Sequence, residues 1–210
     1  MSSRTMKIIV TLSFLVLTQT ASAQILWDQS TLDLMSPGIA NSDSPGFGGF
    51  TIHTVGDVAV TGDGWMVESI TQYYSSWNYD WINAITQGYL HVFPKTGPLP
   101  AEDPSQSAIV PMSAVSFSPD VIAVTASGLS LGLEPGEYWI GITPMAPAGM
   151  FGANLQFATS VVGDEAATYD MMIPGWGNNY VGYDGAMLIA GEPAVPNATS
   201  SWGQIKSNYR

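Results

Sequence analysis

Alternation between apolar and polar residues recurs in short runs along most of the chain. Residues 50–60 and 65–74 form two such runs, and Thr61-Gly62-Asp63-Gly64 between them has the composition of a tight turn. Shorter runs of the same kind follow at 85–93, 115–117, 121–125, 129–133, 138–143, 155–162 and 186–190. A period of two predicts strands with one buried face, and many short strands joined by Gly/Pro turns predict a sandwich or barrel. We therefore predict an all-β chain with a single antiparallel β-sandwich over residues 24–192.

The two ends of the chain lack this alternation. A basic start and the apolar run 8–17 precede Ala21-Ser22-Ala23, which fits a small-x-small cleavage site. These features predict a bacterial export signal over residues 1–23, cleavage before Gln24 and a secreted product. No later apolar run is long enough to span a bilayer, so we expect no membrane partner after cleavage. Residues 193–210 are polar and predict a C-terminal tail.

The mature chain is expected to be strongly acidic. Cleavage would leave three basic residues, Lys95, Lys206 and Arg210, against 17 Asp and Glu residues. Such a surface repels phosphate backbones, which argues against nucleic acid as a partner. The chain has no cysteine, which excludes disulfides, thiol catalysis and Cys-based zinc sites.

One serine motif and two histidines are the candidates for catalysis. Gly128-Leu129-Ser130-Leu131-Gly132 matches the G-x-S-x-G of a nucleophile elbow, but an elbow needs a helix next and a histidine later in the chain. Here a turn and another strand follow, and His53 and His91 both precede Ser130. Each histidine alternates with apolar residues, which predicts that both point away from the core, and no HxH or HExxH spacing occurs. We therefore predict no enzymatic activity and no cofactor.

Acidic residues leave two further options open. A carboxylate pair such as Asp164 with Glu165, or Asp57 with Asp63, would suit a polysaccharide-active enzyme if the two groups faced each other across a cleft. A structural calcium ion would take carboxylate and carbonyl oxygens, with Asp28, Asp57 and Asp63 as candidate ligands. No spaced calcium-loop motif accompanies these acids.

Residues 75–81, SSWNYDW, carry three aromatic side chains at alternate positions. On a strand the three rings would share one face, which either belongs to the protein's own core or meets an outside ligand. Exposed aromatic patches usually serve recognition, and rings at the end of a sandwich can stack on sugars while polar neighbours bind hydroxyls. The candidate ligand-binding residues are Tyr73, Trp77, Asn78, Tyr79 and Trp81. Core packing or loop anchoring of the same residues is the alternative.

Four motifs occur in succession: ILWDQ, TVGDVAVTGDGWMVESITQYY, LEPGEYWIGI and GAMLIAGEPAVP. This succession resembles a widespread group of exported bacterial β-sandwich proteins that often accompany the PEP-CTERM sorting system. The resemblance covers most of residues 25–196 and implies a jelly-roll-like sandwich, with little implied about chemistry. Unlike that pattern, Ala194-Val195-Pro196 is followed by neither an apolar anchor helix nor a basic terminus. We therefore expect no covalent or membrane sorting by that route.

Together these patterns predict a secreted, non-enzymatic structural or recognition module of a surface matrix or filament. Its expected partner is an extracellular glycan or a matrix protein. Two alternatives stay open: a carbohydrate-binding module using Trp77, Tyr79 and Trp81, and a polysaccharide-active enzyme with a carboxylate pair. In a filament, an exposed edge strand would serve as the joint between subunits.

Overall fold

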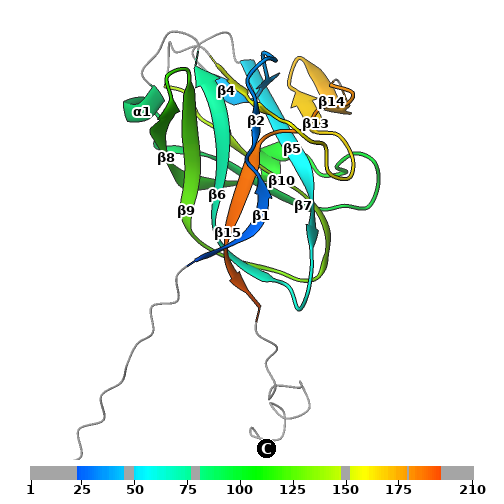
Figure 1. Cartoon of the computed structure of the whole chain (residues 1–210). Helices are drawn as coiled ribbons and strands as arrows, with labels where there is room; N and C mark the ends of the chain where they lie inside the picture. The colour runs from blue at the N-terminus through cyan, green and yellow to red at the C-terminus, as the bar shows by residue number, and fades with distance from the viewer. Residues whose placement is uncertain (1–22, 45–49, 77–80, 148–151, 179, 195–210) are drawn as a thin grey trace, which may run out of the picture.

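The computed structural model describes residues 23–44, 50–76, 81–147, 152–178 and 180–194. Within these residues the chain is almost entirely β-structure, with antiparallel pairing between neighbouring strands (Figure 1). The predicted all-β, sandwich-like fold is therefore confirmed. In the described part of the chain, no helix has the length and apolar character needed to cross a membrane.

Two layers of strands make up the sandwich. The first layer runs in the order β1 (Gln24–Gln29), β15 (Met187–Pro193), β6 (Trp65–Ser76) and β9 (Val121–Leu133). The second layer runs in the order β7 (Gln87–Pro94), β10 (Gly136–Pro144), β5 (Phe50–Val60), β13 (Ala167–Asp170) and β14 (Ile173–Gly177). Strand β8 (Ala108–Ser118) pairs with β9 through its second half and with β7 through its first, so β8 passes from one layer to the other.

Shorter elements close the ends of the two layers. These are β2 (Leu32–Asp33), β3 (Ile39–Ala40), β4 (Ser42–Ser44), β11 (Ala153–Leu155), β12 (Phe157–Ala158), the helix α1 (Trp81–Ala84) and the 3-10 turn η1 (Pro104–Gln106). Strand β4 extends the sheet beside β5, and β2 pairs with β12 in a separate small sheet. The predicted turn at 61–64 is present, with the Gly64 amide donating to the Thr61 carbonyl. It connects β5 in the second layer to β6 in the first.

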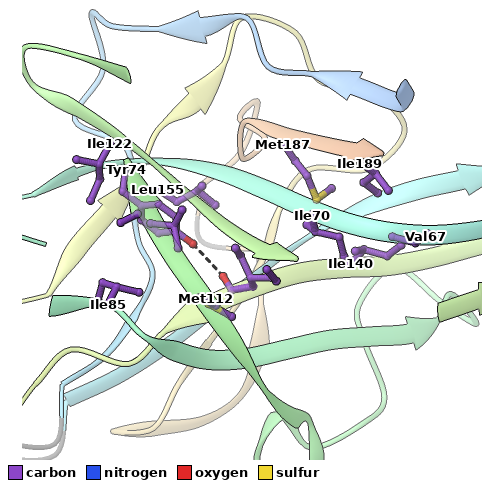
Figure 2. Packing of buried hydrophobic residues seen from close by; sticks show 14 of the residues in the cluster. Val67, Ile70, Tyr74, Ile85, Met112, Ile122, Ile140, Leu155, Met187 and Ile189 are labelled. Carbon is purple, nitrogen blue, oxygen red and sulfur yellow. Dashed lines mark hydrogen bonds between the residues drawn. The ribbon is translucent and has the colours of Figure 1, made fainter. Parts of the chain in front are cut away.

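The main hydrophobic core lies between the layers because alternate residues of each strand point inward. Val67, Ile70 and Tyr74 of β6 meet Ile140 of β10 and Met112 of β8, all of them buried (Figure 2). Figure 2 also labels further members of the cluster: Ile85, Ile122 of β9, Leu155 of β11, and Met187 and Ile189 of β15. Period-two alternation in the sequence therefore builds this core directly.

A second, smaller core covers the outer face of the second layer. Val55, Phe93 and Trp139 point away from the main core, yet all are buried under residues 95–107 and the β13–β14 hairpin. Trp176 links the two covering segments to the sheet. Its Nε1 donates to the Glu102 carbonyl at 2.7 Å, and its ring packs edge-on against Phe93. The outer face of this sheet is thus enclosed, and polar side chains on it are enclosed as well.

Candidate functional site

The candidate site begins where the ladder between β5 and β10 ends. Their pairing stops at Ile140 opposite Gly56, and continuing the register would place Ile142 opposite Thr54. There the Asn41 side chain takes over the backbone hydrogen bonds. Its Nδ2 donates to the Ile142 carbonyl at 2.8 Å and its Oδ1 accepts from the Thr54 amide at 3.2 Å. Because these two backbone partners fix the amide orientation, Asn41 Oδ1 acts only as an acceptor.

Asn41 anchors a chain of hydrogen bonds that leads outward to two histidines. The Thr143 hydroxyl lies 2.8 Å from Asn41 Oδ1, 2.9 Å from His91 Nε2 and 3.2 Å from His53 Nδ1. The hydroxyl has one proton, and Asn41 Oδ1 can only accept it, so both histidine nitrogens must donate to Thr143. We call Asn41, Thr143, His53, His91 and Ser107 the histidine network.

These assignments leave one unprotonated nitrogen on each imidazole. His91 Nδ1 accepts from the Ser107 hydroxyl, 2.7 Å away. His53 Nε2 has no hydrogen-bond partner among the described residues, and it is absent from the fully buried unpaired atoms of that part of the chain. We infer that His53 Nε2 reaches solvent as a free hydrogen-bond acceptor.

Burial sets the charge of both histidines. His53 is 4% exposed and His91 is fully buried. Desolvation lowers the pKa of His53 to about 4, against smaller opposing effects of the Asp43 and Asp103 carboxylates. Desolvation also holds the pKa of His91 well below its ordinary value, and the charge of a protonated His53 would lower it further. Both imidazoles are neutral at pH 7.

The structure refines the prediction for the two histidines. Both point away from the main core, as the alternation predicts, because His53 shares a face of β5 with Val55, and His91 a face of β7 with Phe93, both in the smaller outer core. The sequence pattern does not predict that they meet, yet their ring centroids lie 4.8 Å apart and Thr143 bridges them. The sequence pattern gives the direction of a side chain on its strand, but not the loop that later covers it.

His53 lines a surface pocket of about 490 Å³. The pocket is lined by Asp43, Thr51, His53, Tyr89, Asp103, Pro104, Ser105, Tyr169 and Met171. The Tyr89 and Tyr169 rings pack against the His53 ring, with centroids 5.2 and 6.3 Å away. Strand order places Tyr89, on β7, and Tyr169, on β13, on opposite sides of β5. Asp43 on β4 and Asp103 before η1 add two carboxylates.

The predicted aromatic platform is not supported at its two described ends. Tyr73 is buried on β6, where Phe117 packs edge-on against it. Trp81 is 1% exposed, begins α1 and stacks on Tyr74 in the main core. Neither ring offers a face to an outside ligand, so both assignments are corrected to core packing. Trp77, Asn78 and Tyr79 lie outside the described residues.

Ser130 lies inside β9, and the strand continues to Leu133. Gly128 before it has a positive φ of 69°, at the place where the β6–β9 register shifts, so the glycine serves an irregularity within the ladder. The helix that a nucleophile elbow requires does not follow here.

The acidic residues singled out from the sequence have other partners. Asp28 accepts from the amide and hydroxyl of Ser30, and Asp63 lies exposed in the β5–β6 turn. No group of three or more His, Asp or Glu side chains in the described residues is placed to hold a metal ion. Asp57 has a different neighbour from the one its sequence position suggested: Asp164 donates its backbone amide to Asp57 Oδ2 at 3.1 Å.

Asp57 belongs to a second polar cluster on the outer face of the same sheet. Lys95 Nζ lies 2.7 Å from Asp57 Oδ2, 2.6 Å from Asp164 Oδ2 and 5.1 Å from the centroid of the Trp139 ring. Burial acts to lower the pKa of Lys95, but the hydrogen bonds to Asp164 and Asp57 outweigh it and raise that pKa. Gly163 has a φ of 78°. A Cβ at this position would overlap the Asp57 carboxylate, so the glycine leaves the space that the carboxylate needs. We call Lys95, Asp57 and Asp164 the Lys95 cluster.

Asp184, which is fully buried, lies next to Gly56 on the opposite face of β5 from Asp57. Its carboxylate accepts from Gln29 Nε2 at 2.6 Å and from the Gly185 amide at 2.9 Å. Burial raises its pKa to about 7, and the charge of Asp57 acts in the same direction. The carboxyl group is therefore close to half-protonated at neutral pH.

Sequence reasoning missed the residues that complete the pocket and the histidine network. Asn41, Asp43 and Asp103 occur in polar, loop-like stretches that resemble ordinary connections. The usable signal was the alternation of Tyr89 with His91, which predicts that both share an outward face, together with His53 on another strand. That signal indicates neither which strands are neighbours nor what covers them.

Comparisons with known proteins give no relative for this chain: no family model, curated protein or solved structure matches it. The resemblance drawn from the four sequence motifs therefore stays a prediction.

Proposed function

We propose that this protein is a secreted, non-enzymatic recognition module of the extracellular surface or matrix, and that it binds a saccharide unit in the His53 pocket. The observation that carries the proposal is the combination of two tyrosine rings with an uncharged acceptor and two carboxylates around one depression. Sugar sites use the same combination, in which aromatic rings pack on apolar C–H faces and acceptors bind hydroxyl protons.

The neighbouring contacts favour a preformed site. His53 is oriented by Thr143, and Asp43 accepts from the Thr51 hydroxyl at 2.7 Å. Asp103 caps η1 by accepting from the Ser105 amide at 2.9 Å. Side chains already fixed in this way lose little conformational freedom when a ligand binds, which favours affinity.

Retention of the protein on immobilised polysaccharides tests the proposal. Tyr89→Ala and Tyr169→Ala should each weaken binding about fivefold, because one aromatic contact contributes about 1 kcal/mol. Tyr138→Ala is the matched control: Tyr138 is half-buried, and its hydroxyl donates to the Glu134 carbonyl near the start of β10, away from the pocket. Equal retention of all three variants, or no retention of the native protein on any glycan, would show the proposal to be wrong.

A further inference from the structure

We propose that the saccharide bound in the His53 pocket carries a protonated amino group, as an unacetylated glucosamine unit does. The inference rests on the proposed function and narrows it to one class of glycan. It follows from the hydrogen-bonding capacity and the charge of the groups that line the pocket.

The pocket offers acceptors and has few free donors. The Thr51 hydroxyl donates to Asp43, and the Ser105 hydroxyl and the Tyr89 hydroxyl interact with Asp103 and Asp43 respectively. The carboxylates keep further lone pairs, since each can accept about four hydrogen bonds. A ligand that fits these groups must bring its own N–H or O–H donors.

His53 contributes an acceptor in the same place. Its Nδ1 donates its proton to Thr143. Its Nε2 has no hydrogen-bond partner among the described residues, although the residue is only 4% exposed. The ring remains neutral above its pKa of about 4, so it does not repel a cation. A buried, oriented acceptor beside two carboxylates suits the three donors of an ammonium group.

Charge favours the same ligand. No Lys or Arg lines the pocket among the described residues, and Lys95, the basic residue of the neighbouring cluster, is paired with Asp57 and Asp164. Asp43 and Asp103 therefore leave the pocket with two negative charges that a cation would offset. The rings of Tyr89 and Tyr169 add a cation–π contribution when the cation lies over a ring face.

A bare metal ion fits less well than an organic cation. The described residues contain no group of three His, Asp or Glu side chains with the spacing to hold a metal. An ammonium group needs no such coordination sphere, because it forms directed hydrogen bonds to separate acceptors. Its sugar ring can also pack against the tyrosines, which a metal ion cannot do.

Calorimetric titration with three oligosaccharides of equal length and β-1,4 linkage tests the inference. They differ only at C2: glucosamine has an ammonium group, N-acetylglucosamine an acetamide and glucose a hydroxyl. At about pH 5.5 the amine is protonated while His53 stays neutral. The glucosamine oligomer should bind at least about tenfold more tightly than the other two, and raising the pH until the amine deprotonates should remove the difference.

Two matched variants separate the pocket from general attraction to an acidic protein. Asp103→Asn should weaken binding of the glucosamine oligomer about tenfold and binding of the glucose oligomer much less, because Asn keeps an acceptor oxygen for hydroxyl groups but not the negative charge. Asp63→Asn removes an equal charge from the exposed β5–β6 turn at the other end of β5 and should change neither. Equal losses from the two variants would overturn the inference, because binding would then follow net charge alone.

The outcomes distinguish this inference from the proposed function. If the glucose or acetylated oligomer binds through Tyr89 and Tyr169 as tightly as the glucosamine oligomer, the inference fails while the glycan-binding proposal stands. If none of the three binds and no polysaccharide retains the protein, both fail. Tight glucosamine binding that Asp103→Asn weakens and Asp63→Asn does not would support both.

Discussion

Two polar clusters lie side by side along β5 on the outer face of the second layer, and they differ in almost every respect. The histidine network contains His53 on β5, is uncharged at pH 7 and leaves one acceptor facing a pocket. The Lys95 cluster contains Asp57 on the same strand face, is charged and uses Lys95 Nζ to hold two carboxylates. Both are enclosed by segments distant in sequence.

The difference in hydrogen bonding between the two clusters distinguishes a binding site from a structural cluster. Neutral groups in the histidine network satisfy one another through Thr143 and Asn41, so an unpaired His53 nitrogen is available to a ligand. In the Lys95 cluster the cation is already present, and its removal would leave a buried Asp57 charge without a partner. Each region has an acceptor without a partner among the described residues, but Asp57 Oδ1 is fully enclosed, whereas His53 lines a pocket that a ligand can enter.

Replacing the cation of the Lys95 cluster should have the largest effect. Lys95→Met keeps most of the aliphatic stem but leaves Asp57, whose side chain is 9% exposed, without its counter-ion. We expect a loss of about 3–5 kcal/mol in the free energy of unfolding, measured by urea denaturation. Asp164→Asn is the control: that side chain is 52% exposed, so its loss should cost less than about 1 kcal/mol. Similar values for the two variants would contradict a buried charge pair.

Removing the Asn41 side chain from the histidine network should have the next largest effect on stability. Asn41→Ala leaves the Thr54 amide and the Thr143 hydroxyl without their acceptor, so we expect a loss of about 3 kcal/mol in unfolding free energy. Asn154→Ala is the matched control, because Asn154 donates one exposed hydrogen bond to the Pro37 carbonyl and should contribute less than about 1 kcal/mol. An Asn41→Ala protein as stable as the control would show that the network does not hold β5 against β10.

The histidine network and Asp184, which lies next to Gly56 of β5, should respond to pH with opposite sign. The pKa of His53 is lowered to about 4, so its contribution to stability is complete above its ordinary value of 6.5 and is lost as the pH falls toward 4. His91, with its pKa also lowered, acts in the same direction. The pKa of Asp184 is raised from 3.8 to about 7, so its contribution is complete below pH 3.8 and is lost as the pH rises through 7.

Two variants isolate these opposing effects. Between about pH 4 and 6.5, Asp184→Asn should make the acid loss of stability steeper by about 1.4 kcal/mol per pH unit, and His53→Gln should make it shallower by a similar amount. Urea denaturation at a series of pH values measures both slopes. Parallel profiles for the native protein and either variant would mean that the altered group does not titrate as described.

Replacing Asp by Asn should change stability least at Asp103, on the edge of the pocket, and more at Asp57, in the Lys95 cluster. Asp103→Asn keeps an oxygen that can cap η1, and Asp103 is exposed, so we expect no measurable change in the unfolding midpoint. Asp57→Asn weakens hydrogen bonds to Lys95 and the Asp164 amide and should cost about 1–3 kcal/mol. Thermal unfolding of the two proteins checks the contrast. A larger loss at Asp103 than at Asp57 would reverse the roles assigned to the two clusters.

Much of the fold could be predicted because strand alternation is local. The runs at 50–60 and 65–74 correspond closely to β5 and β6, and the turn between them is where its glycines indicate. Local alternation could not decide whether Trp81 is exposed, because the residue before it in the chain does not determine what packs on its ring. The structure places Trp81 at the start of α1, where its ring stacks on Tyr74 of β6.

The sequence by itself determined the strand-rich fold, the inward residues of each strand and the outward direction of His53 and His91. The tertiary structure alone decided which of these outward groups meet. His53 and His91 contact Thr143, which lies 90 and 52 positions away, and Asn41 lies 102 positions from Thr143. A period of two depends on backbone geometry within one strand, whereas the pairing of strands and the cover over their outer face depend on the packing of the whole chain.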